Sequence, residues 1–159
     1  MTEASQAPGR SERWPDLAGR AEAGRHVLPV RVYFEDTDFS GLVYHASYVR
    51  WMERGRSDWL RLLGVHHGEL MGEEAAAGSA AFVVRRLEID YLKPARIDDV
   101  LEVETACLEK TAATLLLEQI VRCGNIILCR GRVLVVLVSS RGRPLRLPER
   151  LRVRLGGVG

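Results

Sequence analysis

Long apolar runs are absent from this sequence of 159 residues. No window approaches the roughly 18 consecutive apolar residues of a membrane-spanning helix. Residues 1–26 lack the apolar stretch of about 7–15 residues that a secretory signal contains. They are rich in Ala, Gly, Arg and Glu, which is typical of a disordered extension. We therefore expect no membrane span and a cytoplasmic location.

An excess of charge of either sign is missing as well. The chain has 23 basic and 21 acidic residues and a net charge of +2, so no nucleic-acid partner is expected. Arginines gather only in the C-terminal tail, residues 141–159, where a short basic helix is predicted to start near Pro148. Such a tail is more often a solvated terminus than a binding patch.

Cysteine is scarce, and the three cysteines have no CxxC spacing. Cys107, Cys123 and Cys129 lie in apolar, strand-like runs and are predicted to be buried reduced thiols, in agreement with a cytoplasmic location. The adjacent His66 and His67 would point about 100° apart on a helix, and no cysteine or carboxylate completes a ligand set. We expect neither a metal nor a cofactor.

The hydrophobic residues that are present, 47% of the chain, suffice for the core of one domain, placed at residues 27–140. The first strand is predicted at residues 27–34, with Val30, Val32 and Phe34 on one face and Arg31 and Tyr33 on the other.

A long amphipathic helix is predicted at residues 46–63, because apolar residues recur there every three or four positions. Gly55 costs about 1 kcal/mol in a helix interior relative to Ala, so it is expected to mark the close approach of another backbone. A short second helix is expected at about residues 66–74.

Beyond Ala80 the hydrophobic period changes to two, which predicts four more strands. They are placed at about residues 83–91, 101–107, 115–122 and 126–138. A tight hairpin turn joins the last pair, and the final strand is expected to lie centrally because both of its faces are apolar. Consecutive strands are expected to be antiparallel neighbours. The order predicts an α+β fold in which a five-stranded antiparallel sheet wraps one long central helix.

The acidic turn before this helix, residues 35–45, is the candidate site. The first N–H groups of the helix, around His45 and Ala46, lack partners within the helix and lie at the positive end of its dipole. Such donors hold a carbonyl oxygen as negative charge develops on it, and Asp38 would either attack the carbonyl or deprotonate a water. A thioester suits this arrangement because its thiolate leaving group has a low pKa and needs little acid assistance.

Structural roles compete with this interpretation. From residue type alone, capping of a turn or helix is the commoner role for Asp36 and Asp38, and His45 more often starts a helix than takes part in catalysis.

The residues of the turn and helix closely resemble those of hotdog-fold acyl-CoA thioesterases. The resemblance rests on residues 33–48, YFEDTDFSGLVYHASY, and residues 51–56, WMERGR. It is closest to the 4-hydroxybenzoyl-CoA thioesterase class, and within it to the thioesterases associated with the Tol-Pal envelope system. It implies a hotdog fold, hydrolysis of acyl-CoA thioesters to free acid and CoA, and a homodimer or homotetramer that binds acyl-CoA at a subunit interface.

By position, the resemblance implies catalytic roles for Asp38 and His45 and substrate-binding roles for Gly41 and Tyr44. His45 favours short-chain or small acyl groups over aromatic ones. Phe39-Ser40 replaces the Ala-Gly or Pro-Ala pair usual in the family, and the phenyl ring is expected to narrow or reshape the acyl pocket.

Two other functions remain open on the sequence. One is a 3-hydroxyacyl-thioester dehydratase, although the His/Asp pair usual for that reaction is not found. The other is a binding module for acyl carrier protein or an envelope protein with weak turnover, since the basic tail suits an acidic carrier. Candidate partners for the CoA phosphates are the basic residues Arg85, Arg86, Lys93 and Arg96.

Overall fold

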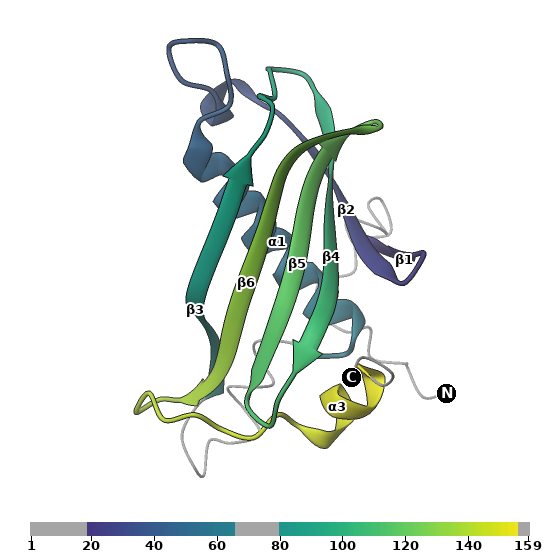
Figure 1. The fold of residues 1–159 in the computed structure, drawn as a ribbon, viewed down its shortest axis with the longest axis vertical. Coiled ribbons are helices and arrows are strands. Elements are labelled where there is room, and N and C mark those ends of the chain that lie inside the picture. Colours follow the sequence, from purple (N-terminus) through teal and green to yellow (C-terminus); the bar gives the residue numbers. More distant parts are fainter. Residues whose placement is uncertain (1–18, 66–79, 156–159) are drawn as a thin grey trace, which may run out of the picture.

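A computed structural model describes residues 19–65 and 80–155 of the chain. A single antiparallel sheet of six strands lies against one long helix (Figure 1). The strands are β1 (Arg20–Glu22), β2 (Arg25–Arg31), β3 (Ala80–Tyr91), β4 (Val100–Lys110), β5 (Thr114–Cys123) and β6 (Ile126–Ser139). The helices are the 3-10 helix η1 (Phe34–Asp36), α1 (His45–Leu62) and α3 (Glu149–Arg154). The predicted α+β architecture around one long helix is confirmed.

The sheet has six strands instead of the expected five because β1 forms a hairpin with β2. Both strands of this hairpin begin within residues 1–26, so the predicted disordered extension is wrong for residues 20–26. Residues 1–18 lie outside the described part of the chain. The strand predicted at residues 27–34 ends at Arg31, so the prediction is wrong for residues 32–34, and Phe34 lies in η1 with its side chain 82% exposed.

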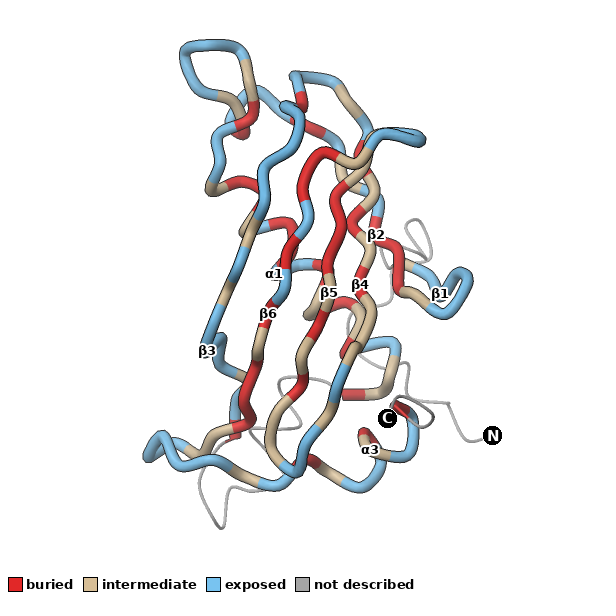
Figure 2. Tube along the Cα trace, in the orientation of Figure 1, coloured by how far each residue is buried: buried red, intermediate tan, exposed pale blue. Residues whose placement is uncertain are grey.

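The strand order is β1-β2-β4-β5-β6-β3, which corrects one predicted pairing. β3 pairs with β6, from Ala80 opposite Ser139 to Tyr91 opposite Cys129, and not with the next strand along the chain. β2 takes the place beside β4. β6 therefore has a neighbour on each side, as expected of a central strand, whereas β3 forms an edge of the sheet. Buried residues concentrate on β4, β5 and β6, and β3 is largely exposed (Figure 2).

Helix α1 begins and ends within one residue of its predicted bounds. Its buried side includes Trp51, 2% exposed, and Met52, fully buried, which share one core cluster with residues of β2, β4, β5 and β6. Gly55 lies where the helix comes closest to β4 and β5. A Cβ atom there would be 3.0 Å from Cγ1 of Val103 and 3.3 Å from Nε2 of Gln119. The close approach predicted from Gly55 is therefore made by side chains of the sheet, and not by another backbone.

The remaining elements close the two ends of the sheet. Gly124, with a φ of 56°, and Asn125 form the predicted turn between β5 and β6. The basic helix α3 begins after its N-cap Pro148. The short helix expected at residues 66–74 lies outside the described residues. All three cysteines are free; Cys129 is buried, whereas Cys107 and Cys123 are only partly buried, contrary to prediction.

Candidate active site

Asp36 organises the entrance to the acidic turn. Its buried Oδ2 accepts a hydrogen bond from the backbone N–H of Tyr33 at 2.9 Å, and its carbonyl oxygen accepts one from Tyr44 N–H at 2.8 Å. Arg50 on α1 places a guanidinium nitrogen 3.7 Å from Oδ1. These contacts join the turn to the start of α1, so Asp36 has the structural capping role expected from its residue type.

A tight chain reversal presents Asp38. The N–H of Asp38 donates to the Leu42 carbonyl at 3.0 Å, and the N–H of Gly41 donates to the Asp38 carbonyl at 3.0 Å. Gly41 has a φ of 79°, a conformation that residues with a Cβ seldom adopt. Gly41 does not line the pocket described below; its observed contribution is to the turn.

The Asp38 carboxyl group is exposed and bound on one side by Ser40. Oδ1 accepts hydrogen bonds from the Ser40 hydroxyl and from the Ser40 backbone N–H, the latter at 2.8 Å. The hydroxyl bond, and after it the backbone bond, lowers the pKa of Asp38 below its ordinary value of 3.8. Asp38 is therefore ionised at neutral pH.

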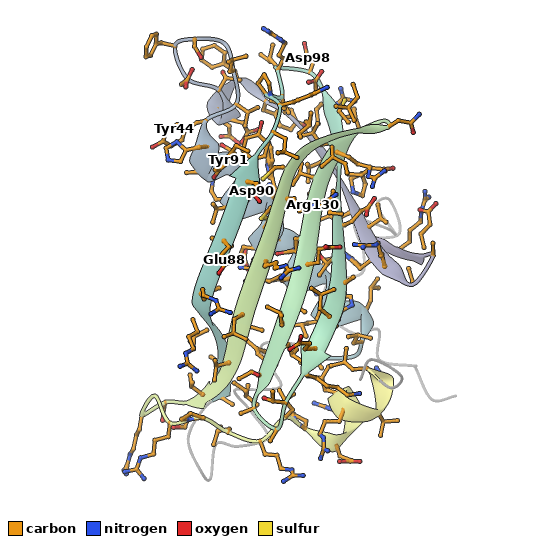
Figure 3. The ribbon with its side chains drawn as sticks, in the orientation of Figure 1. Tyr44, Glu88, Asp90, Tyr91, Asp98 and Arg130 are labelled. Atoms are coloured by element: carbon orange, nitrogen blue, oxygen red, sulfur yellow. The ribbon has the colours of Figure 1, made fainter. Side chains whose placement is uncertain are left out.

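Helix α1 follows directly after this turn. Tyr44 is its N-cap and His45 its first residue, so the N–H groups of His45 and Ala46 have no acceptor within the helix, whereas the N–H of Ser47 donates to the Tyr44 carbonyl at 2.9 Å. The Tyr91 hydroxyl, at the end of β3, donates to the His45 carbonyl at 2.9 Å. The Tyr91 and His45 rings meet edge to face with centroids 6.4 Å apart. This hydrogen bond anchors the start of α1 to the edge strand, and Tyr44 and Tyr91 lie together at this end of the molecule (Figure 3).

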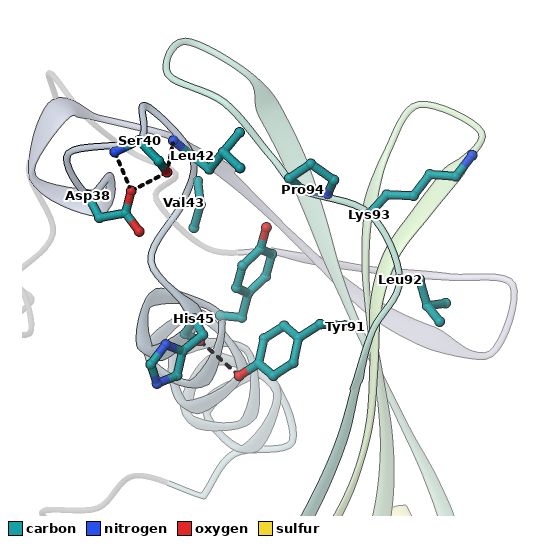
Figure 4. A pocket seen from close by; sticks show the side chains of 10 residues that line it. Asp38, Ser40, Leu42, Val43, His45, Tyr91, Leu92, Lys93 and Pro94 are labelled. Carbon is teal, nitrogen blue, oxygen red and sulfur yellow. Dashed lines mark hydrogen bonds between the residues drawn. The ribbon is translucent and has the colours of Figure 1, made fainter.

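The turn, the helix start and the end of β3 surround a pocket of about 440 Å³ (Figure 4). Asp38 and His45, both predicted as site residues, line it together. Tyr44 does not line it, although its ring lies 4.3 Å from that of His45 between centroids. The site thus joins two segments that are far apart in the sequence.

Sequence reasoning missed several other residues that line this pocket. Ser40, Tyr48 and Tyr91 are among them. The signal for Tyr91 was its position at the end of a strand pattern, but the sequence did not show that this end meets the start of α1. Lys93, one of the candidate partners for the CoA phosphates, also lines the pocket. Arg86 instead pairs with Glu88, with its Nε atom 3.5 Å from Oε1 of the Glu88 carboxylate.

Phe39 corrects another expectation. Its side chain is fully exposed and does not line the pocket of this chain. Within one subunit the ring therefore does not narrow the pocket, because the reversal between Asp38 and Leu42 turns it outwards.

Residues 40–134 match the thioesterase superfamily. The chain belongs to this superfamily. The acyl-CoA thioester hydrolase YbgC of Escherichia coli O6:H1 is 42% identical to this chain over 123 residues, which are 76% of this chain and 88% of the relative. The acyl-CoA thioesterase YbgC of Haemophilus influenzae is 40% identical over 126 residues, which are 79% and 90% of the two chains.

Solved structures show the same similarity. A probable thioesterase from Bartonella henselae, 39% identical, matches with a TM-score of 0.73 and covers 78% of this chain and 99% of its own. The predicted thioesterase family and hotdog fold are confirmed.

Within residues 19–65 and 80–155, no group of three or more His, Cys, Asp and Glu side chains is placed to hold a metal ion. No helix in these ranges is long and apolar enough to cross a membrane.

Proposed function

We propose that this chain hydrolyses acyl-CoA thioesters to the free acid and CoA, with Asp38 and His45 as catalytic residues. The observation that carries the proposal is that the ionised Asp38 carboxylate and the first turn of α1 border the same pocket. The acyl-CoA hydrolase names of relatives at 40% and 42% identity support the choice of substrate.

The geometry suits attack on a thioester carbonyl. The carbonyl oxygen would point at the N–H groups of His45 and Ala46, which stabilise negative charge in the tetrahedral intermediate. Asp38 then either attacks the carbonyl carbon to form an acyl-aspartyl anhydride or deprotonates the water that attacks it. In the anhydride route Asp38 displaces the CoA thiolate and water then hydrolyses the anhydride, whereas in the general-base route the activated water displaces the thiolate directly. Both routes break the C–S bond, consume one water and give the free acid and CoA.

Turnover of Asp38→Asn tests this role. The amide keeps the shape of the side chain and an acceptor for Ser40, but it is neither a base nor a nucleophile, so we expect kcat to fall by about 10²–10⁴-fold. The assay measures CoA release from a panel of short, long and aromatic acyl-CoAs, and formation of enoyl-CoA is followed to detect a dehydratase. Glu109→Gln is the matched control, because it removes one exposed negative charge on β4. Near wild-type turnover by Asp38→Asn would remove Asp38 from the mechanism.

Isotope labelling separates the two roles of Asp38. After repeated turnover in H₂¹⁸O, hydrolysis of an anhydride at the aspartyl carbon leaves ¹⁸O in the Asp38 carboxyl group. General-base catalysis labels only the product acid. Detection of ¹⁸O in the peptide that contains Asp38, by mass spectrometry, therefore identifies the nucleophilic route.

The acyl group and its carrier are part of the proposal. We propose short-chain or small acyl groups, because Leu42, Val43 and Pro94 contribute apolar side chains to a pocket of about 440 Å³. Comparison of the same acyl group on CoA and on acyl carrier protein tests whether an acidic carrier protein is a partner. A carrier that binds without turnover of any thioester would favour the binding-module alternative.

We also propose a homodimer or homotetramer. β3 supports it, since this edge strand of 12 residues has one unpaired side and exposes Val83 and Val84. Light scattering that gives the mass of a single chain across the assay concentrations would contradict it. A cytoplasmic location is proposed from the three free cysteines, and cell fractionation tests it.

A further inference from the structure

Ser40 stands out because both of its hydrogen-bond donors near Asp38 go to the same carboxylate oxygen. The hydroxyl and the backbone N–H of Ser40 donate to Oδ1 (Figure 4). The Ser40 hydroxyl oxygen in turn accepts from the Leu42 N–H at 3.4 Å. Oδ2 of Asp38 accepts no hydrogen bond from the described residues. The two oxygens of one carboxylate therefore have different surroundings.

We propose that Ser40 is a positioning residue for the hydrolysis: it holds Oδ1 of Asp38, so that Oδ2 is the oxygen presented to the thioester carbonyl or to the attacking water. This inference rests on the proposed function. An aspartate on an exposed loop has free rotation about two side-chain bonds, and two donors on one oxygen restrict both. The hydroxyl is specific to the serine, whereas the backbone N–H would remain with any residue except proline.

The second effect of this contact is on ionisation. The Ser40 bonds lower the pKa of Asp38, so the carboxylate persists to lower pH than it would without them. Loss of the hydroxyl is therefore expected to raise the pKa of Asp38 and to move the acidic limb of the activity profile to higher pH. The other titratable groups around the pocket are His45 and Tyr48 on α1, Tyr91 on β3 and Lys93 beyond it.

Because several ionisable side chains line this pocket, activity alone does not identify the group that changes. The test therefore joins two measurements on wild type, Ser40→Ala, Ser40→Thr and Ser57→Ala. The first is kcat and kcat/KM against pH with the best acyl-CoA substrate. The second is a ¹³C NMR titration of the Asp38 carboxyl carbon without substrate. Ser57→Ala is a matched control, because the Ser57 hydroxyl also donates to a carboxylate, that of Glu53 at 2.6 Å, away from this pocket.

For Ser40→Ala we expect kcat to fall by about tenfold or more with KM little changed, because small displacements of a catalytic group cost up to about 10²-fold. The Asp38 titration should move to higher pH, and Ser40→Thr should restore both properties. Ser57→Ala should match wild type. Ser40 is exposed, so its replacement is not expected to unfold the chain.

The proposal is overturned if Ser40→Ala keeps the wild-type kcat, whether or not Asp38 titrates differently. It is also overturned if kcat falls without a change in the Asp38 titration, or if threonine fails to restore it. If wild type releases no CoA from any thioester, the proposed function fails. The NMR titration still reports separately whether Ser40 holds the Asp38 carboxylate.

Discussion

The most informative stability test is Gln119→Leu, because Gln119 joins the long helix to the sheet. This residue of β5 is fully buried. Its Nε2 donates to the Met52 carbonyl at 2.8 Å and to the Thr105 hydroxyl at 2.8 Å. Its Oε1 accepts from Arg56 at 3.0 Å. A leucine of similar volume keeps the packing and removes all of these hydrogen bonds.

The expected loss of stability follows from comparing the hydrogen bonds that are removed with the apolar side chain that is buried in their place. Neutral hydrogen bonds contribute about 1 kcal/mol each and one to a charged partner about 1.5–3 kcal/mol, so the removed bonds amount to about 3.5–5 kcal/mol. Leucine recovers about 1.5–3 kcal/mol by burying an apolar side chain. We therefore expect Gln119→Leu to lower the free energy of unfolding by about 2 kcal/mol.

Urea denaturation followed by circular dichroism measures the loss. All variants are compared at one protein concentration, since an oligomer gains stability by mass action. Part of the loss arises from the unpaired Thr105 hydroxyl, so the double variant with Thr105→Val should recover about 1 kcal/mol. A Gln119→Leu variant as stable as wild type would show that these bonds add nothing to the packing of α1. If the double variant loses more unfolding free energy than the two single variants lose in sum, the assignment to Thr105 is refuted.

Two further predictions concern Tyr91 and Cys129. Tyr91→Phe removes the hydroxyl that donates to the His45 carbonyl at 2.9 Å. We expect kcat to fall severalfold, while the free energy of unfolding changes by less than about 1 kcal/mol. Unchanged kinetics would mean that this bond does not hold the start of α1 in place. Burial, with a smaller effect of Asp90, raises the pKa of Cys129 from 9.0 to about 12. The stability that this thiol contributes is therefore complete below pH 9 and is lost as the pH rises towards 12. Above pH 9 the free energy of unfolding should therefore fall less steeply with pH in Cys129→Val than in wild type. Equal slopes of this free energy against pH would contradict the prediction.

Sequence patterns predicted those parts of the fold that depend on interactions between residues close in the sequence. The bounds of α1 and the turn at Gly124 could be predicted because a helical stripe and a glycine turn depend on neighbouring residues. The acidic turn was predictable for the same reason. It leads into a helix N-terminus, where Asp38 and His45 line the same pocket.

The partners across the sheet and across the site were decided only by the tertiary structure. A period of two shows which face of a strand is buried but not which strand lies beside it, so the sequence did not predict that β3 pairs with β6. That pairing brings Tyr91 to His45 and into the lining of the pocket. The outward direction of Phe39 likewise depends on the backbone reversal that the hydrogen bonds between Asp38 and Leu42 complete. The sequence alone determined the candidate residues Asp38 and His45, because they lie in one turn, and the long-range pairing of the edge strand decided which residues surround them.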